Sequence, residues 1–419
     1  MKTHYLALCA ALLGSPFLQA VEVTGVKAHS QWPWGSDVEV EFTIANPATE
    51  TERYLIEISG VANEGRDVLV AKTLADEPVC RKGTHRITWR FAKDYPNYRA
   101  ADLILKVKAT PYAASTGAYL VFDLSAGSTA KSYPHWYTTV APQVEKNVEQ
   151  TCKTTEMWFR RVPGGTCVQG GGDGGNNALP ERPVTIKNDY YVAIFETTKQ
   201  QWYQVLADWS GAWTDEASRS ARPVENITDI GNKRANGAIR GNWNTSDAQA
   251  ASSGRPCDGN SFVGYLRSRT GFTEIDLPTE AQWEHACRAG TTGERHSDLP
   301  ISQLARMGAA DSDKTVGPDL GGPAIVGSYE PNPWGLYDMY GNVLELCLDR
   351  WSASPTGVAR DKAETDPLGP VDVDNNNYRV CRGGYYAAGS DAYFTSFYRR
   401  SFNAKSAWLG FRLIINIVD

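Results

Sequence analysis

The sequence has few histidines, no cluster of basic residues and no long apolar run. Six histidines, with no C-x-x-C or Cys/His spacing, argue against a zinc site. A net charge of −6, with lysines and arginines scattered along the chain, argues against a nucleic-acid partner held by a basic surface. No stretch approaches the roughly 20 apolar residues that a membrane-spanning helix needs. We therefore expect a globular protein with neither nucleic acid nor membrane span.

The first twenty residues resemble a secretory signal peptide. Lys2 supplies the positive end, Tyr5 to Leu13 the apolar core, and Leu18-Gln19-Ala20 a small-residue cleavage site. Because Leu8 is too large for the position before a lipidated cysteine, Cys9 is a poor lipoprotein site. We expect cleavage after residue 20 and a secreted, periplasmic or cell-surface protein. Seven cysteines then remain, an odd number whose pairing the sequence does not give: Cys80, Cys152, Cys167, Cys257, Cys287, Cys347 and Cys381.

Residues 21–140 carry the pattern of an all-β domain. Apolar side chains alternate with polar ones along 37–44, and the pattern returns near 54–58, 87–91, 103–109 and 119–124. Asn, Gly and Pro separate these runs, and no helical period appears. Short alternating strands of this kind predict an immunoglobulin- or fibronectin-like sandwich. Trp32-Pro33-Trp34 is expected to pack at its edge. Residues 141–154 are polar and are interpreted as a linker.

Residues 155–419 mix helical signals with glycine-rich loops. Thr198 with Gln201, and Thr279 with Gln282, have the spacing of capping boxes, which predicts helices over 198–210 and 278–288. A shorter helix is expected at 261–269. The loop at 163–177 lacks the Lys-Ser/Thr ending of a phosphate-binding loop. Glu280, Glu284 and His285 lack metal-ligand spacing and are interpreted as structural.

One stretch, 334–350, combines buried-type apolar residues with polar groups at a tight turn. Asn342 and Glu345 place an amide oxygen and a carboxylate three residues apart, next to Gly341. Oxygen ligands suit a hard cation such as Ca²⁺, with carbonyls of the same turn beside them. From the residues alone, a core turn whose polar groups cap backbone N–H groups is the favoured alternative.

Four motifs in order resemble the formylglycine-generating enzyme (sulfatase-modifying factor) family. They are Y-Y-V-A-I-F-E-T-T-K-Q-Q from 190, L-P-T-E-A-Q-W-E-H-A-C-R-A-G from 277, W-G-L-Y-D-M-Y-G-N-V-L-E-L-C-L-D-R from 334, and R-V-C-R-G-G from 379 with G-F-R at 410–412. The resemblance implies an α+β fold of C-type-lectin-like kind. It also favours a structural calcium site at Gly341, Asn342, Val343 and Glu345.

The sequence departs from this family at its best-known chemistry. Family enzymes oxidise a substrate cysteine with copper held by two cysteines between the R-G-G and G-F-R motifs. That interval contains no cysteine here, and the two positions fall near Ala392 and Phe397. Because a thiolate pair is what selects Cu(I), copper is not expected. No catalytic residue is assigned.

The same interval is rich in aromatic residues and, by the family resemblance, faces the ligand. We expect ligand-binding residues at Tyr393, Phe394, Phe397, Tyr398 and Arg399. The favoured hypothesis is a secreted, calcium-stabilised, non-catalytic protein that binds a peptide, protein or glycan outside the cytoplasm. The alternatives are an oxidase for formylglycine or another sulfur-containing substrate, and a lectin-fold protein with a variable ligand-display segment.

Overall fold

The structure, a computed structural model, describes residues 21–30, 37–47, 52–98, 103–113, 117–172, 181–209, 221–227, 238–241, 257–308, 321–352, 363–369 and 378–417. The expected signal peptide and Trp32-Pro33-Trp34 lie outside these ranges. The chain forms two compact units. The first ends at Tyr112 but excludes Lys72–Asp76, which belong with Ala113 onward to the second. No helix in the described ranges is long and apolar enough to cross a membrane.

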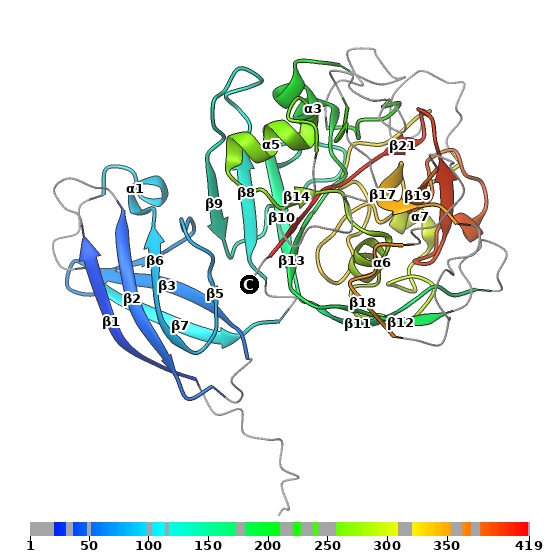
Figure 1. The fold of residues 1–419 in the computed structure, drawn as a ribbon. Coiled ribbons are helices and arrows are strands. Elements are labelled where there is room, and N and C mark those ends of the chain that lie inside the picture. The colour runs from blue at the N-terminus through cyan, green and yellow to red at the C-terminus, as the bar shows by residue number, and fades with distance from the viewer. Residues whose placement is uncertain are drawn as a thin grey trace, which may run out of the picture. The chain divides into compact units, whose positions relative to one another are not determined.

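The first unit is almost entirely β (Figure 1). One sheet has the order β1-β2-β6, and the other has the order β4-β3-β5, with β7 also paired to β3. The elements are β1 (Glu22–Ser30), β2 (Val38–Ala45), β3 (Tyr54–Ala62), β4 (Asp67–Val70), β5 (Val79–Cys80), β6 (Gly83–Trp89), α1 (Phe91–Asp94) and β7 (Ile104–Pro111).

The core of this unit follows from the alternation of its strands. Val40, Phe42 and Ile44 of β2 are fully buried, while the residues between them are partly exposed. Trp89 of β6 is buried too, and its ring lies 3.7 Å from the position a Cβ would take on Gly60 of β3. The two sheets therefore pack face to face. The expected all-β sandwich is confirmed.

The second unit is an α+β domain built from short elements. They are β8 (Tyr119–Asp123), β9 (His135–Thr138), α2 (Thr151–Thr154), β10 (Glu156–Val162), β11 (Gly165–Gln169), β12 (Arg182–Ile186), β13 (Tyr190–Ala193), α3 (Lys199–Leu206), α5 (Phe262–Thr270), β14 (Ile275–Asp276), α6 (Glu280–Arg288), α7 (Ile301–Leu304), β15 (Ala305–Arg306), β16 (Tyr340–Gly341), β17 (Leu344–Arg350), β18 (Glu364–Thr365), β19 (Arg379–Arg382), η3 (Asp391–Tyr393), β20 (Arg399–Phe402), β21 (Leu409–Gly410) and β22 (Ile414–Asn416).

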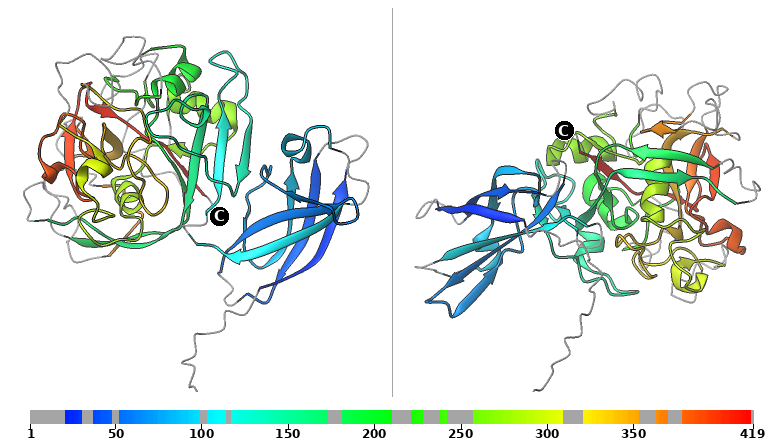
Figure 2. Two further views of the ribbon diagram at one scale, coloured as in Figure 1. Left: turned by 180° about the vertical axis from the view of Figure 1, so that it is seen from behind. Right: turned by 90° about the horizontal axis from the view of Figure 1, so that it is seen from below.

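A six-stranded sheet of order β14-β22-β13-β10-β8-β9 has an apolar core on each face. One core joins Phe122 and Phe159 of the sheet to Trp202 of α3 and Phe262 of α5. Figure 2 shows these two helices beside the sheet from two further directions. The other core joins Val192 and Ile414 of the sheet to α6 and to the 334–348 stretch. A four-stranded sheet, β20-β19-β17-β21, carries the segments discussed below.

The helices begin where the sequence predicts. Thr198 and Thr279 each accept a hydrogen bond from the backbone N–H three residues on. In return, the side-chain oxygens of Gln201 and Gln282 accept a hydrogen bond from the backbone N–H of Thr198 and Thr279. The first of these helices ends at Leu206, short of the expected Ser210. Its last turn is closed by Ala207, which has a left-handed backbone with φ of 56°.

The division between the units differs from the boundary expected near residue 140. Strand β8, expected in the sandwich, pairs instead with β10 of the second unit, Tyr119 lying opposite Arg160. Residues 151–154 of the expected linker form helix α2, in which Lys153 is fully buried. Alternation identified the strand, but it did not indicate the sheet to which the strand belongs.

Candidate functional site

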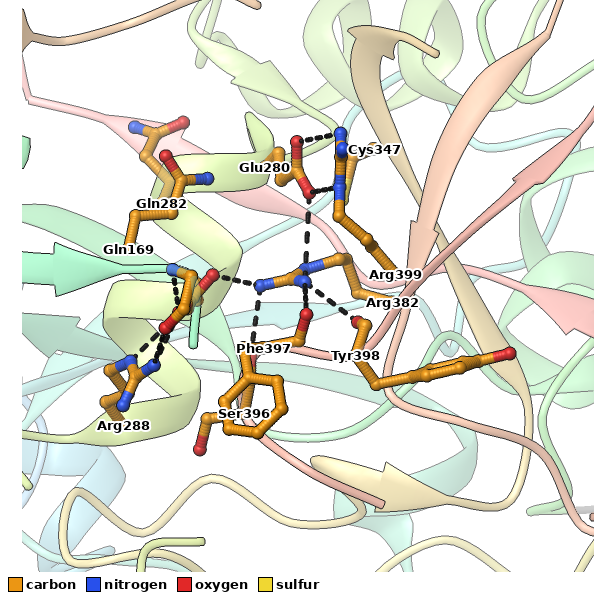
Figure 3. Close-up of polar contacts among 12 residues, drawn as sticks. Gln169, Glu280, Gln282, Arg288, Cys347, Arg382, Ser396, Phe397, Tyr398 and Arg399 are labelled. Atoms are coloured by element: carbon orange, nitrogen blue, oxygen red, sulfur yellow. Dashed lines mark hydrogen bonds and ion pairs between the residues drawn. The ribbon is translucent and has the colours of Figure 1, made fainter. Parts of the chain in front are cut away.

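One buried arginine forms hydrogen bonds to the backbone of the segment that is expected to face a ligand. Arg382, at the end of β19, donates from Nη1 to the carbonyls of Phe397 and Tyr398, both at 2.8 Å. Its Nη2 donates to the carbonyl of Ser396 at 3.0 Å. Figure 3 shows this side chain among the three carbonyls. The backbone over 396–398 is therefore fixed by a single guanidinium.

Helix α6 supplies the carboxylates that balance this charge. Arg382 pairs with Glu284, and its Nη1 lies 3.7 Å from Glu280. Burial opposes the charge of Arg382, but Glu284 and then Glu280 raise its pKa above the ordinary value. Glu284 also accepts from Arg288 and from the backbone N–H of Gly170, at 2.9 Å each. The sequence interpretation of these two glutamates as structural agrees with these contacts.

Arg399 is held by the same helix. Its guanidinium forms a two-pronged pair with Glu280, with distances of 2.7 and 2.8 Å, and lies 4.7 Å from the ring centre of Trp351. Burial raises the pKa of Glu280, but Arg399 and Arg382 outweigh it and hold that pKa below the ordinary value. Arg399 therefore anchors β20 to α6.

Four of the five side chains expected to bind ligand are buried in the structure. Phe394 is fully buried, and Phe397, Tyr398 and Arg399 are 5 to 7% exposed. Only Tyr393 is half-buried. The partly exposed side chains of the same interval also include Tyr385, Arg400, Phe402 and Trp408.

The positions expected for the family's copper cysteines, near Ala392 and Phe397, carry no thiol. Ala392 is exposed in the short helix η3, and the ring of Phe397 packs against Gly171 and Gly172. Neither side chain has a metal donor. Burial raises the pKa of the nearest thiols in sequence, Cys347 and Cys381, above the ordinary value. The residues present here do not fit copper.

The expected calcium ligands are mostly engaged with the protein. Glu345 accepts from Arg412 with both oxygens, at 2.6 Å each, and from Trp283 at 2.7 Å. Asn342 accepts the N–H of Ala324 at 2.8 Å with its side-chain oxygen, and its amide nitrogen donates to Glu196. The amide oxygen of Asn342 is thus already committed to the backbone. Gly341 and Val343, the other two expected ligands, are buried in the same turn.

Asp338, which the sequence interpretation did not propose as a metal ligand, is a buried acid with one oxygen that accepts no hydrogen bond. It is 1% exposed, and its Oδ1 has no hydrogen-bond partner, although Oδ2 accepts from Gly327 at 2.6 Å. Burial raises the pKa of Asp338 to about 6, and the neighbouring Glu345 adds to the shift. Burial, followed by Asp338 and Glu345, also raises the pKa of Glu196 well above its ordinary value. Burial and mutual repulsion therefore favour the neutral forms of Asp338 and Glu196.

A hard cation at this turn would find its free side-chain oxygen on Asp338 in place of Asn342. In the described ranges no three His, Cys, Asp or Glu side chains gather as a metal-binding group, so carbonyls of the turn would complete the set. Glu345 would share its charge with Arg412. The signal that could have revealed Asp338 is the placement of a second acid seven residues before Glu345 in the same motif.

Comparison with known proteins supports the resemblance seen in the sequence. Residues 141–417 match the model of the sulfatase-modifying factor enzyme 1-like domain. The chain is 27% identical over 267 residues to the serine/threonine-protein kinase pkn1 of Chlamydia pneumoniae, covering 63% of this chain and 38% of that protein. It is 34% identical over 117 residues to the formylglycine-generating enzyme of Thermomonospora curvata, covering 26% of this chain and 38% of that enzyme.

One solved structure is similar to part of the chain. PvdO from Pseudomonas aeruginosa aligns with a TM-score of 0.45 and 18% identity, covering 66% of this chain and all of PvdO. The chain spans less than half the length of the two curated relatives named above. The family match itself covers well over half of the chain. The chain therefore belongs to the formylglycine-generating enzyme (sulfatase-modifying factor) family. In sequence, its α+β domain follows an all-β sandwich.

Proposed function

We propose that this protein is a secreted, non-catalytic member of its family that binds a ligand through its second unit. The observation that carries the proposal is the absence of cysteine between the R-G-G and G-F-R motifs, where the family's copper-binding pair is expected near Ala392 and Phe397. Phe397 fills the space against Gly171 and Gly172, so the position is used for packing. Without a soft thiolate pair in this interval, the protein lacks the family's holder for Cu(I). The sequence pattern of a signal peptide supports export.

The buried ion pairs support the same proposal. Glu280 and Glu284 of α6 are bound to Arg399 and Arg382, with short contacts and almost no exposure. Carboxylates held in this way lack the accessible, adjustable proton that a general acid or base needs. Their arrangement gives a rigid support under a ligand-facing surface.

An oxidase assay tests the proposal directly. Mature protein would be loaded with copper under air and reductant and incubated with a peptide carrying the Cys-x-Pro-x-Arg motif of sulfatases. Mass spectrometry is expected to show unchanged cysteine, while a copper-loaded formylglycine-generating enzyme converts the same peptide in parallel. Formylglycine in the test sample would overturn the proposal and make this chain an oxidase with unconventional ligands.

We further propose that calcium stabilises the turn around Asp338 and Glu345. The unpartnered Asp338 oxygen and the buried acids near it support it. Since an ion that binds only the folded state stabilises it, added Ca²⁺ should raise the melting temperature, and chelation should lower it. Asp338→Asn should remove the response, and Asp391→Asn, exposed in η3, should keep it. An unchanged melting temperature on chelation, with no metal co-purifying, would contradict this.

A further inference from the structure

A half-buried aromatic cluster surrounds Arg400 at the edge of the four-stranded sheet. Arg400 and Phe402 lie on β20, which pairs with β19 alone in the described ranges. The guanidinium carbon lies 5.5 Å from the ring centre of Tyr385, 5.2 Å from that of Phe402 and 5.8 Å from that of Trp408. One cation is therefore held between three ring systems.

The rings also pack on one another, which makes the surface rigid. Tyr385 stacks on Trp408 with centres 4.8 Å apart and planes 25° apart. Tyr393 meets Tyr385 edge-on at 6.0 Å and meets Tyr398 edge-on at 5.1 Å. Rings fixed in this way lose little conformational freedom when a ligand binds.

Among the described residues, Arg400 differs from Arg382, Arg399 and Arg412 in having no carboxylate within ion-pair distance. Arg382, Arg399 and Arg412 each pair with a buried glutamate. Among the described residues no carboxylate lies within ion-pair distance of Arg400, and its side chain is half-buried. Burial disfavours its charge, but hydrogen bonds with Tyr385 and Tyr398 raise its pKa above the ordinary value. The guanidinium is thus charged and oriented, and no described carboxylate serves as its counterion.

We propose that the Arg400 cluster (Tyr385, Tyr393, Arg400, Phe402 and Trp408) binds an acidic saccharide, with the sugar carboxylate on Arg400 and the pyranose ring against the aromatic faces. This inference rests on the proposed ligand-binding function and names its ligand class. A guanidinium offers two parallel N–H donors to a carboxylate. Tyr385 and Trp408 stack on one another, so the part of this pair that remains exposed, together with Phe402, offers apolar ring surface to the C–H face of a sugar.

The polar edges of the cluster favour a saccharide over an acidic peptide. Tyr385 and Tyr393 are both half-buried and meet edge-on, and a phenol hydroxyl can both donate and accept a hydrogen bond. A ligand with one anion and several hydroxyls matches one cation flanked by several hydroxyls. A peptide carries far fewer hydroxyls, so it would form fewer hydrogen bonds with the tyrosine hydroxyls.

Titration calorimetry on the mature protein tests the inference with trigalacturonic acid as the probe. Its carboxyl-reduced, neutral counterpart and a glutamate-rich hexapeptide are the comparison ligands. We expect the acidic trisaccharide to bind, and the neutral one to bind roughly tenfold more weakly or worse, since a charged hydrogen bond is lost. The same loss is expected for Arg400→Gln. Arg400→Lys should lose part of the affinity, because it keeps the charge without the fork.

A matched control and the contrary outcomes complete the test. Lys146→Gln removes one exposed positive charge from the same unit, where it pairs with Glu330, and should leave affinity unchanged. Circular dichroism verifies that each variant is folded. No binding of the acidic trisaccharide, equal binding by Arg400→Gln, or binding of the hexapeptide alone would overturn the inference. None of these outcomes produces formylglycine, so they are distinct from a failure of the proposed function in the oxidase assay.

Discussion

Two buried arginines of the second unit are each paired with a glutamate far away in sequence. Arg412 pairs with Glu345, and Arg382 with Glu284, in sites that are at most 1% exposed. Removing two charges from water is expensive, and the attraction between them offsets this only when both partners are present. These pairs therefore contribute more to a unique arrangement of α6, β17 and β19 than to net stability.

Removing one partner of such a pair should be strongly destabilising. Glu284→Gln would leave Arg382 and Arg288 facing a neutral amide in a buried site. We expect the free energy of unfolding to fall by roughly 3–5 kcal/mol, as measured for broken buried pairs. Urea denaturation followed by tryptophan fluorescence would measure it.

The exposed pair Arg66–Glu64 provides the control for this change. Both side chains are more than three-quarters exposed, so Glu64→Gln should alter stability by less than about 0.5 kcal/mol. If Glu284→Gln were as mild as Glu64→Gln, the network under the ligand-facing segment would not be the support described above.

Two buried histidines should make the second unit sensitive to acid. Burial lowers the pKa of His285 and of His296 to about 4, and both ring nitrogens of His296 lack a partner. Between about pH 6.5 and pH 4 the unfolded chain therefore binds protons that the folded chain does not. Above about pH 6.5 the buried neutral histidines cause no loss of stability. As the pH falls from about 6.5 to 4, the free energy of unfolding decreases. Asp338, with its raised pKa, acts in the opposite direction.

Comparison with a variant isolates the contribution of His296. His296 stacks on Tyr340 with ring centres 5.0 Å apart, so His296→Phe keeps an aromatic ring there and removes the titration. Urea unfolding at several pH values between 4 and 7 should give a smaller loss of stability on acidification for this variant. His29→Gln, exposed in the first unit, is the control. Identical pH dependence of wild type and His296→Phe would show that His296 accepts a proton without penalty.

At the scale of elements, helix starts were predictable from sequence and their partners were not. Thr198 and Thr279 with their glutamines are local signals, and both capping boxes form. The side chains that α6 presents are equally local, but Glu284 meets Arg382 at a separation of 98 residues. Several arginines could have matched each acid on sequence grounds alone. The early stop of α3 at Ala207 also escaped prediction, because alanine rarely adopts a left-handed backbone.

The loop at 170–172 is shaped by its contact with Phe397. Gly172 has φ of +77°, and a Cβ there would lie 2.8 Å from the Phe397 ring. Gly172→Ala should therefore suffer both backbone strain and a clash, lowering the free energy of unfolding by roughly 2–4 kcal/mol. Chemical denaturation would measure it, and adding Phe397→Leu should recover the part that comes from the clash.

Gly271 offers a matched control for the backbone term. Its φ is +82°, and nothing lies within 4 Å of the corresponding Cβ position. Gly271→Ala should therefore show the backbone strain alone, roughly 1 kcal/mol. Equal effects of the two substitutions would mean that Phe397 moves aside freely, and the packing argument for that position would fail.

At the scale of the whole molecule, one short segment lies within the first unit in sequence but belongs to the second unit in space. Lys72–Asp76 lie between strands β4 and β5 of the first unit but belong to the second. Leu74 is 1% exposed and exchanges two backbone hydrogen bonds of 2.8 Å with Tyr137 of β9. Local patterns place strands on the chain, but such an exchange depends on tertiary packing. The expected boundary near residue 140 differs from the compact units for the same reason.

Leu74→Ala should therefore weaken the second unit while leaving the first intact. Loss of a buried leucine side chain lowers the free energy of unfolding by roughly 2–5 kcal/mol. Hydrogen exchange followed by mass spectrometry should show faster exchange in peptides from β8 and β9, and unchanged exchange in β2 and β3. Leu69→Ala, only five residues earlier and 5% exposed in β4, should give the reverse pattern. Faster exchange in β2 and β3 on Leu74→Ala would assign the segment to the sandwich and contradict the division of the chain.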